Sequence, residues 1–328
     1  MRLGLETIHA AHERIRPYIH RTPVLTSSRL DAASGASLFF KCENFQKIGA
    51  FKARGATNAV FSLDDAIAKH GVATHSSGNH GAAVARAAKL RGIPAHVVMP
   101  SNSAKVKVRT VESYDAHVVF CEPTEESRES TCAEVIKKTG ATLIHSFENE
   151  DVMAGQGTAA VELLEDVSDI DLVICPVGGG GLLSSTGVAA KTMRPKIKVI
   201  AAEPANADDA AQSFRAGRLI RTEKKFTIAD GLRTNVGAPN FSIIQRHVDD
   251  IVTVSEEAII SAMRTIWETM KIIIEPSAAV PYAAIMKRQP SVAAATYGSA
   301  NKLDITGKRV GIILTGGNVD LDALPWQL

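Results

Sequence analysis

Short apolar runs alternate with longer amphipathic segments along most of this chain, and this alternation constrains the fold more than any other feature. Strand-like runs occupy residues 38–42, 72–75, 96–99, 117–121, 142–145, 172–177, 198–202, 251–254 and 309–314. Helical patterns occupy residues 80–91, 125–138, 157–165, 182–193 and 256–270. Such alternation is typical of an α/β fold, in which helices cover a largely parallel sheet and ligands bind at the carboxyl ends of the strands.

The length of the chain predicts more than one hydrophobic core. A chain of 328 residues is long enough for two cores. The segment 71–148 is a compact series of strand and helix units. We therefore expect a small α/β domain at 71–148, inserted between the two parts, 1–70 and 149–328, of a larger domain that binds the ligand.

Composition and charge exclude several classes of protein. The net charge is +2, from 37 Lys and Arg against 35 Asp and Glu, so no nucleic-acid-binding surface is expected. The four cysteines, Cys42, Cys121, Cys132 and Cys175, form no C-x-x-C pair and are interpreted as reduced thiols. The first residues carry charge too early for a secretory signal, and no apolar run approaches the length of a membrane span. We expect a cytoplasmic protein without membrane contact.

Two turns combine a strand, a loop of small residues and a helix start, at residues 75–81 and 176–182. Each opens a helix whose unpaired N–H groups and dipole favour an anion. Lys52 stands at the head of a third helical segment. Two anion sites and one amine suit pyridoxal phosphate joined to an amino acid, because that molecule carries a phosphate at one end and a carboxylate at the other. Lys52 would supply the amine of the Schiff base.

The glycine-rich turn also permits a different interpretation. Gly178–Gly181 follow a strand, precede a helix, and are followed by Glu203 near the place where a dinucleotide-binding protein holds a ribose. An NAD-dependent oxidoreductase is therefore an alternative. The third glycine of G-x-G-x-x-G is missing, however, since Ser184 stands at that position. The loop suits a single phosphate better. A non-catalytic amino-acid-binding protein is the third alternative.

Five motifs occur in the order seen in one enzyme family, at residues 51–58, 76–81, 154–157, 178–181 and 315–321. With them the chain resembles, over essentially its whole length, the fold-type II (tryptophan synthase β-like) pyridoxal-phosphate enzymes. The resemblance is greatest to the group of serine racemases, serine/threonine dehydratases and threo-3-hydroxyaspartate ammonia-lyases. It implies two three-layer α/β/α domains with mostly parallel twisted sheets, and a homodimer.

The resemblance assigns roles to particular residues. Lys52 and Ser77 are the catalytic pair, in which Lys52 removes the Cα proton and Ser77 could supply an acid on the opposite face for racemisation. The hydroxyl of Thr315 would face the pyridine nitrogen and leave the ring unprotonated, which favours loss of a β substituent. The cofactor contacts are Phe51, Lys52, Asn79, Gly178, Gly179, Gly180, Gly181, Leu182, Gly231 and Thr315. The substrate contacts are Ser76, Ser77, Gly78, Asn79, His80 and Arg128.

A metal site is also implied by the resemblance. Glu203, Ala207 and Asp209 match positions that supply two carboxylates and a backbone carbonyl to a divalent cation. Oxygen ligands of this kind suit Mg²⁺, or Ca²⁺ or Mn²⁺ in its place. The local sequence is explained nearly as well if Asp208 and Asp209 simply cap a helix.

The identity of the substrate depends on the arginines. Arg128 and, less strongly, Arg233 could pair with a second carboxylate. Ala82 and Phe147 stand where serine racemases tend to have polar side chains. The chain is thus predicted to be an ammonia-lyase (dehydratase) of 3-hydroxy amino acids, which eliminates water to give a 2-oxo acid and ammonia and prefers 3-hydroxyaspartate to serine and threonine. A serine racemase with dehydratase side activity is the alternative, and besides a second copy of the chain the partner expected is a small amino-acid substrate.

Overall fold

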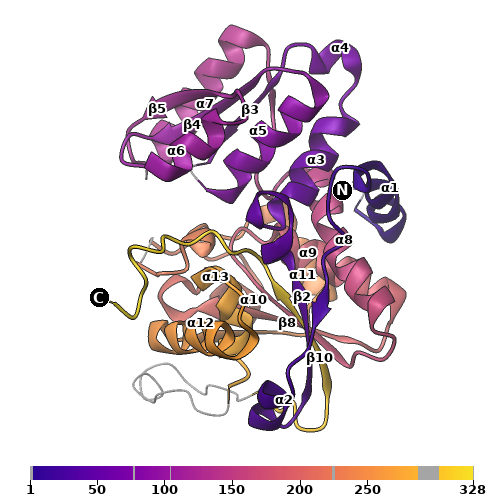
Figure 1. Ribbon diagram of the computed structural model, residues 1–328. Helices are drawn as coiled ribbons and strands as arrows, with labels where there is room; N and C mark the ends of the chain where they lie inside the picture. Colours follow the sequence, from indigo (N-terminus) through magenta and orange to yellow (C-terminus); the bar gives the residue numbers. More distant parts are fainter. Residues whose placement is uncertain (1–2, 77, 104, 224–225, 287–302, 328) are drawn as a thin grey trace.

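Two β-sheets form the framework of the protein (Figure 1). The computed structural model describes residues 3–76, 78–103, 105–223, 226–286 and 303–327. The larger sheet has the strand order β1-β2-β10-β7-β8-β9, and all neighbouring strands are parallel except β1 and β2. Its strands are β1 (Val24–Leu25), β2 (Ser37–Cys42), β7 (Leu172–Pro176), β8 (Lys198–Pro204), β9 (Asp250–Val254) and β10 (Arg309–Leu314).

The smaller sheet is parallel throughout, with the order β5-β4-β3-β6. Its strands are β3 (Val72–His75), β4 (Ala95–Pro100), β5 (His117–Cys121) and β6 (Thr142–Leu143). The prediction of an α/β fold with two mostly parallel sheets is therefore confirmed. All strands of this sheet lie within the predicted small domain, but the exact domain boundaries stay a prediction.

Helices connect most of the strands. They are α1 (Leu5–Ile15), α2 (Ser28–Ser34), α3 (Lys52–Ser62), α4 (Asp65–Ala68), α5 (Asn79–Arg91), α6 (Lys105–Glu112), α7 (Glu125–Thr139), α8 (Glu150–Asp166), α9 (Gly181–Met193), α10 (Asp209–Ala216), α11 (Ala238–His247), α12 (Glu256–Met270) and α13 (Pro276–Ala283). Four short 3₁₀ segments are also described: η1 (Glu43–Phe45), η2 (Lys47–Gly49), η3 (Ala205–Ala207) and η4 (Asp230–Leu232).

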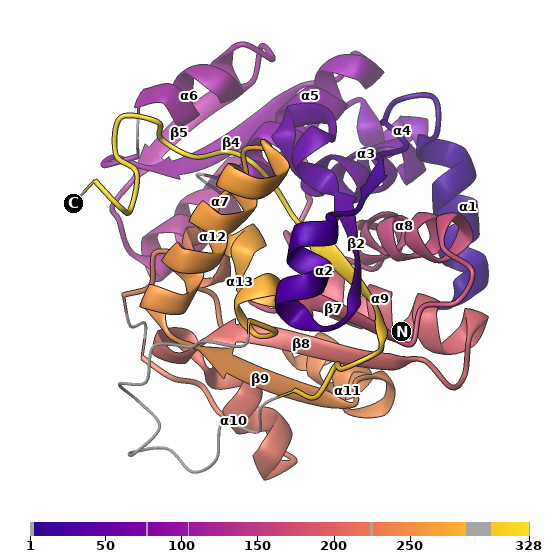
Figure 2. The same cartoon turned by 60° about the horizontal axis from the view of Figure 1, so that its bottom comes forward.

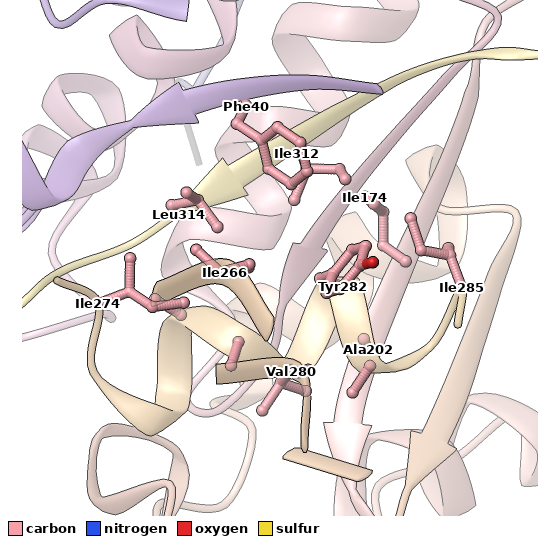
Figure 3. Packing of buried hydrophobic residues seen from close by; sticks show 14 of the residues in the cluster. Phe40, Ile174, Ala202, Ile266, Ile274, Val280, Tyr282, Ile285, Ile312 and Leu314 are labelled. Atoms are coloured by element: carbon pink, nitrogen blue, oxygen red, sulfur yellow. The ribbon is translucent and has the colours of Figure 1, made fainter. Parts of the chain in front are cut away.

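Side chains that alternate along the strands build a core on each face of the larger sheet. On one face, Ile174 and Ile312 pack with Ile266 of α12 and Val280 of α13 (Figure 3). Figure 2 shows α12 and α13 lying together over this part of the sheet. On the other face, Val173 and other strand residues join a cluster with α8, α9, α10 and α11. The sheet is the middle of three layers.

The smaller sheet is also covered on both faces. Its strands share one hydrophobic cluster with α3, α5 and α6, and a second, smaller cluster with α7. Ala56, Ala59 and Val60 of α3 belong to the first of these clusters, although α3 precedes the segment 71–148 in the sequence. Because α3 also contacts α8, it joins the two halves of the molecule.

Several predicted elements differ from the structure in length, and β6 and α8 are two of them. β6 ends at Leu143 instead of residue 145, because the chain turns at His145. α8 begins at Glu150, not at Gly157, with the Asn149 side chain accepting a hydrogen bond from Val152 N–H. The glycines of the 154–157 motif lie inside this helix. Glycine is needed there because α8 packs closely against its neighbours. A Cβ on Gly155 would come within 2.6 Å of the Arg54 carbonyl oxygen.

Two predictions about the surface and the cysteines can be compared with the structure. Among the helices that the structure describes, none is long and apolar enough to cross a membrane. All four cysteines are described, and each is a buried free thiol, as predicted.

Candidate active site

Lys52 is the first residue of α3, and its side chain is partly buried. Its Nζ donates a hydrogen bond to the Ser146 carbonyl at 3.0 Å and lies 5.1 Å from the centroid of the Phe51 ring. Burial lowers the pKa of Lys52 to about 8, although the charge of Glu275 opposes this effect. The neutral amine, which is the nucleophile and the base, is therefore far more populated near neutral pH than in an ordinary lysine, although it is still the minor form.

The chain before α3 is bound to the end of β10. Ala50 forms an antiparallel bridge with Gly316, and the N–H of Phe51 donates to the Thr315 carbonyl at 2.9 Å. These contacts bring Lys52 to the carboxyl end of the larger sheet. Thr315 is buried, and no described group forms a hydrogen bond with its Oγ1. A buried hydroxyl without a partner is costly, so this oxygen suits a ligand atom that accepts a hydrogen bond.

The loop Gly178–Gly181 connects β7 to α9, and only glycine fits at its centre. Gly180 has φ +91°, and a Cβ there would come within 2.9 Å of Asn240. A Cβ on Gly179 would come within 2.3 Å of the Phe147 ring. The helix that follows has no side-chain cap in the described part of the chain. An uncapped helix N-terminus behind a loop of glycines is suited to a phosphate.

Two other predicted cofactor residues lie around this loop. The N–H of Gly231 donates to Ser277 Oγ at 3.1 Å, and a Cβ on Gly178 would lie 3.4 Å from the Gly231 carbonyl oxygen. The η4 turn therefore rests against the glycine loop. Leu182 is buried in the hydrophobic cluster on the α9 side of the sheet. Its side chain is part of the core, so Leu182 could serve a phosphate only through its N–H.

The second predicted anion site is the start of α5, after β3. Ser76 Oγ accepts a hydrogen bond from Gly78 N–H at 3.3 Å, and a Cβ on Gly81 would come within 2.3 Å of the Ser76 carbonyl oxygen. No side chain among the described residues caps this helix. Ser77, the predicted acid, lies outside the described residues. The turn thus provides a second uncapped helix N-terminus close to the end of a strand.

Asn79 and His80 differ in where their side chains lie. Asn79 Nδ2 is 3.1 Å from each carboxyl oxygen of Glu275. His80 is buried, with Nε2 2.9 Å from the Ile144 carbonyl, and burial together with the charge of Lys52 lowers its pKa to about 3. The His80 imidazole is therefore a neutral interior group, and only the backbone N–H of His80 could contact a substrate carboxylate.

Glu275 is a site residue that the sequence analysis missed. Burial and the charge of Asp230 raise its pKa to about 7, while the hydrogen bonds from Asn79 lower it. Asn318 extends the network, because its Nδ2 donates to Asn79 Oδ1 at 2.9 Å. Asn318 belongs to the 315–321 motif and could have been found, whereas Glu275 lies in no motif and is 196 positions from Asn79 in the chain.

The two arginines considered for a second carboxylate differ in their contacts. Arg128, on α7, is partly buried, and its Nε donates a long hydrogen bond of 3.4 Å to the carbonyl of Thr124, which precedes the same helix. Burial lowers the pKa of His75, the charge of Glu129 raises it, and the charge of Arg128 makes a smaller contribution that lowers it. Arg233 donates twice to the Thr227 carbonyl, at 3.0 and 2.7 Å. Arg128 is therefore the arginine more available to a ligand.

The predicted metal ligands are occupied by backbone groups. Both carboxyl oxygens of Glu203 accept N–H bonds from α10, at 3.1 Å from Ala210 and 2.8 Å from Ala211. Asp209 Oδ2 accepts from Val236 N–H at 2.7 Å. Burial and the charge of Asp209 raise the pKa of Glu203, and burial raises that of Asp209 to about 6. Within the described ranges no group of three or more His, Cys, Asp and Glu side chains could hold a metal ion. Two buried carboxylates still suit a hard cation if the Ala207 carbonyl and water complete its shell.

A buried ionic cluster lies two residues beyond Lys52 on α3. Arg54 bonds to Glu43 at 2.7 and 2.8 Å and to Glu162 at 2.8 and 2.7 Å. Lys41 Nζ lies 2.7 Å from Glu162 and 2.7 Å from the Thr22 carbonyl. Because its amine is held in this cluster, Lys41 is not available to a ligand. The cluster was not anticipated, although Arg54 lies in the motif that contains Lys52.

Two mostly parallel sheets, a lysine amine of lowered pKa and a glycine loop before an uncapped helix are the features expected of an enzyme that binds pyridoxal phosphate. A sequence profile described as "Pyridoxal-phosphate dependent enzyme" matches residues 15–316. The chain belongs to this family, in its fold-type II branch.

Individual relatives are similar over nearly the whole chain. The β-hydroxyaspartate dehydratase of Paracoccus denitrificans (strain Pd 1222) is 50% identical over 322 residues, which cover 98% of each chain. The serine racemase of Oryza sativa subsp. indica is 48% identical over 323 residues, 98% of this chain and 93% of the relative. The structure of maize serine racemase superposes with a TM-score of 0.93 at 46% identity and covers 100% of this chain and 97% of that chain.

The family and the geometry of Glu203 both argue against a dinucleotide site. The matched family uses pyridoxal phosphate. Glu203, which would hold the ribose in the NAD interpretation, is buried and bonded through both oxygens to the start of α10. Because Glu203 is only 1% exposed, it offers no open surface to a ribose hydroxyl.

Proposed function

We propose that the protein is an ammonia-lyase (dehydratase) of 3-hydroxy amino acids and that 3-hydroxyaspartate is its preferred substrate. The observation that carries the elimination chemistry is the buried Thr315 hydroxyl, which has no hydrogen-bond partner among the described residues and lies at the end of β10, beside Lys52. The relative named as a β-hydroxyaspartate dehydratase supports the choice of substrate. The homologous serine racemases support the wider class of amino-acid substrates.

The residues present fit pyridoxal phosphate. Lys52 would bind it covalently, the N–H groups of Gly178–Gly181 would hold the phosphate, and Thr315 would donate a hydrogen bond to the ring nitrogen. Asn79 would lie on the side of the ring hydroxyl, with its amide oriented by Glu275. When bound, the cofactor withdraws electrons from the Cα of the amino acid.

The protein's own groups would then direct the reaction. Lys52 Nζ, with its lowered pKa, would take the Cα proton. The uncapped start of α5 would hold the α-carboxylate through its N–H groups. Because a neutral hydroxyl at Thr315 leaves the ring nitrogen unprotonated, charge is poorly stored there, and departure of the β-hydroxyl is favoured. The enzyme would release a 2-oxo acid and ammonia.

The function is tested by incubating the purified protein with 3-hydroxyaspartate, serine and threonine and measuring ammonia and the 2-oxo acid. We expect turnover of all three, fastest with 3-hydroxyaspartate. Bound cofactor without turnover of any hydroxy amino acid would instead support a non-catalytic amino-acid-binding protein. We further propose that the protein acts as a homodimer, which light scattering coupled to gel filtration tests.

Arg128 is proposed to read the second carboxylate of the substrate. We expect Arg128→Ala to lower kcat/KM for 3-hydroxyaspartate by about 30-fold, equivalent to ~2 kcal/mol, because a charged hydrogen bond is lost. For serine, kcat/KM should change by less than about threefold, because serine offers no second carboxylate. The measurement is kcat/KM for both substrates in the parent and the variant.

Arg233→Ala is the matched control for this prediction. Its guanidinium holds the Thr227 carbonyl, so its loss should affect both substrates alike. A parent enzyme that prefers serine, or an Arg128 variant that loses both activities equally, would mean that Arg128 does not select the substrate.

A serine racemase with dehydratase side activity is the second candidate, supported by the serine racemases among the relatives. Racemisation needs an acid on the face of the substrate opposite Lys52, and Ser77 is the residue proposed for it. The assay for D-serine formed from L-serine separates the two candidates. A D-serine rate that exceeds the elimination rate with every hydroxy amino acid would favour the racemase.

A divalent cation, Mg²⁺ or in its place Ca²⁺ or Mn²⁺, is proposed to bind Glu203, Asp209 and the Ala207 carbonyl. We expect Mg²⁺ to raise the Tm of the chelator-treated protein by a few degrees, because a ligand that binds only the native state stabilises it. In Glu203→Gln and Asp209→Asn this response should disappear. If parent and variants respond identically to chelator and to Mg²⁺, these carboxylates only start helix α10.

A further inference from the structure

The turn of residues 145–148 links the amine of Lys52 to the glycine loop. Carbonyl groups in this turn and just before it are bonded to groups outside it: that of Ile144 to Thr74 Oγ1 at 2.9 Å, and that of Phe147 to Asn240 Nδ2 at 2.9 Å. The Ser146 carbonyl accepts from Lys52 Nζ at 3.0 Å and, more weakly, from Gln156 Nε2 at 3.4 Å. The conformation of this short turn therefore decides where the acceptor of the Lys52 amine lies.

Two backbone N–H groups of the same turn donate to one side chain of the turn, that of His145. His145 Nδ1 accepts hydrogen bonds from the N–H of Glu148 at 3.0 Å and of Phe147 at 3.4 Å. This is the pattern by which a side-chain acceptor folds the two or three residues that follow it. An Nδ1 that accepts two N–H bonds must itself be unprotonated.

The surroundings of His145 keep its ring neutral. Burial, together with the charges of His75 and Lys52, lowers the pKa of His145 to about 4. The ring packs at steep angles against His75, with centroids 5.6 Å apart, and against Phe147, with centroids 4.6 Å apart. A neutral, packed imidazole keeps its acceptor in place throughout the pH range in which the Lys52 amine titrates.

The same turn reaches the glycine loop at its other end. The ring of Phe147 lies against Gly179, where any side chain would overlap it. Asn240 donates to both the Phe147 carbonyl and the Gly179 carbonyl, at 2.9 and 2.7 Å. His145 is therefore the first residue of a turn that contacts the Lys52 amine through Ser146 and the proposed phosphate site through Phe147.

We propose that His145 is a positioning residue for the reaction: by accepting the N–H groups of Phe147 and Glu148 it holds the Ser146 carbonyl against the amine of Lys52. This inference rests on the proposed role of Lys52. His145 does not contact the reacting atoms in this proposal. It acts on the rate of proton transfer because the amine is oriented by the carbonyl that the turn presents.

The test compares three variants of the full-length protein carrying its cofactor. In His145→Leu the acceptor is lost, so kcat should fall about tenfold, with KM within about twofold of the parent. In His145→Asn an amide oxygen can accept the same N–H groups, so kcat should recover to within about threefold of the parent. In His145→Gln the oxygen lies one bond further from the backbone, and kcat should resemble that of the leucine variant.

A second readout does not depend on turnover. With the cofactor removed, trace acetylation and peptide mapping at several pH values give the pKa of the Lys52 amine. We expect this pKa to rise from about 8 toward the ordinary lysine value in His145→Leu, because a loosened turn admits water, and to stay low in His145→Asn. Thermal melting establishes that each variant is folded.

Two results would overturn the inference. One is a folded leucine variant with the kcat and the Lys52 pKa of the parent. The other is an asparagine variant as slow as the glutamine variant, which would mean that the ring, not its acceptor atom, matters. If borohydride reduction of the parent does not place the cofactor on Lys52, the proposed function itself fails, and this outcome is distinct from the other two.

Discussion

Lys52→Ala should abolish the absorbance band of the lysine-bound cofactor and lower turnover by at least about 10³-fold, because both the covalent attachment and the base are lost. The fold should survive, since the Lys52 side chain is only partly buried and, among the described residues, its Nζ donates to a single carbonyl, that of Ser146. The measurements are the visible spectrum, the rate of ammonia release, and the Tm of parent and variant.

Lys47→Ala is the matched control for this prediction, because Lys47 is a partly buried lysine that precedes α3 by five positions. It should keep the spectrum and the activity of the parent. Borohydride reduction followed by peptide mapping should find the cofactor on Lys52. Finding it on Lys47, or on Lys41 despite its burial in the ionic cluster, would contradict the assignment.

Arg54→Met should destabilise the protein by about 3–5 kcal/mol, the largest effect on stability that we expect from one substitution. Arg54 is completely buried and forms the centre of a cluster with Glu43 and Glu162. Methionine fills a similar space, but it leaves Glu43 without its guanidinium partner, and a buried carboxylate is costly to leave unpaired. The measurement is the free energy of unfolding from denaturant titration, where the unfolding is reversible.

Arg21→Ala is the control, because Arg21 pairs with Glu165 at 3.0 Å and Asp166 at 2.5 Å but is about half exposed. Its loss should cost less than about 1 kcal/mol, since water screens exposed pairs. If both substitutions cost the same, the cluster around Arg54 contributes nothing beyond an ordinary surface pair.

The cluster also predicts how stability depends on pH. Burial raises the pKa of Glu162, but hydrogen bonds from His12 and Arg54 and the charges of Arg54 and Lys41 outweigh this and hold it far below its usual value. A carboxyl with a depressed folded pKa stabilises the protein above its unfolded pKa, near ~4.3, and loses this contribution as the pH falls below it. In Arg54→Met the Glu162 pKa should rise, so the protein should lose less stability on acidification between about pH 5 and pH 3 than the parent does.

The candidate site was predictable where its residues lie in short motifs. Lys52, the glycine loop and Thr315 each stand next to a strand end or a helix start, and the local pattern is enough to place them there. The start of α5 was found for the same reason, although the burial of the His80 side chain was not. The sequence favoured Arg128 over Arg233 as a partner of a second carboxylate, but only the folded chain shows that the Arg233 guanidinium is held by the Thr227 carbonyl.

The sequence by itself determined the alternation of strands and helices, the parallel sheets and the residues at the strand ends, because these depend on periodicity and on neighbours within one turn. Tertiary structure alone decided the contacts between distant segments: Arg54 with Glu162, 108 positions away, and Asn79 with Glu275, 196 positions away. The same holds for the turn after β6, where His145 Nδ1 accepts two N–H groups and the Ser146 carbonyl meets Lys52, 94 positions away in the chain. Such contacts follow from how sheets and helices pack, and no local pattern in the chain records which polar groups that packing will bury together.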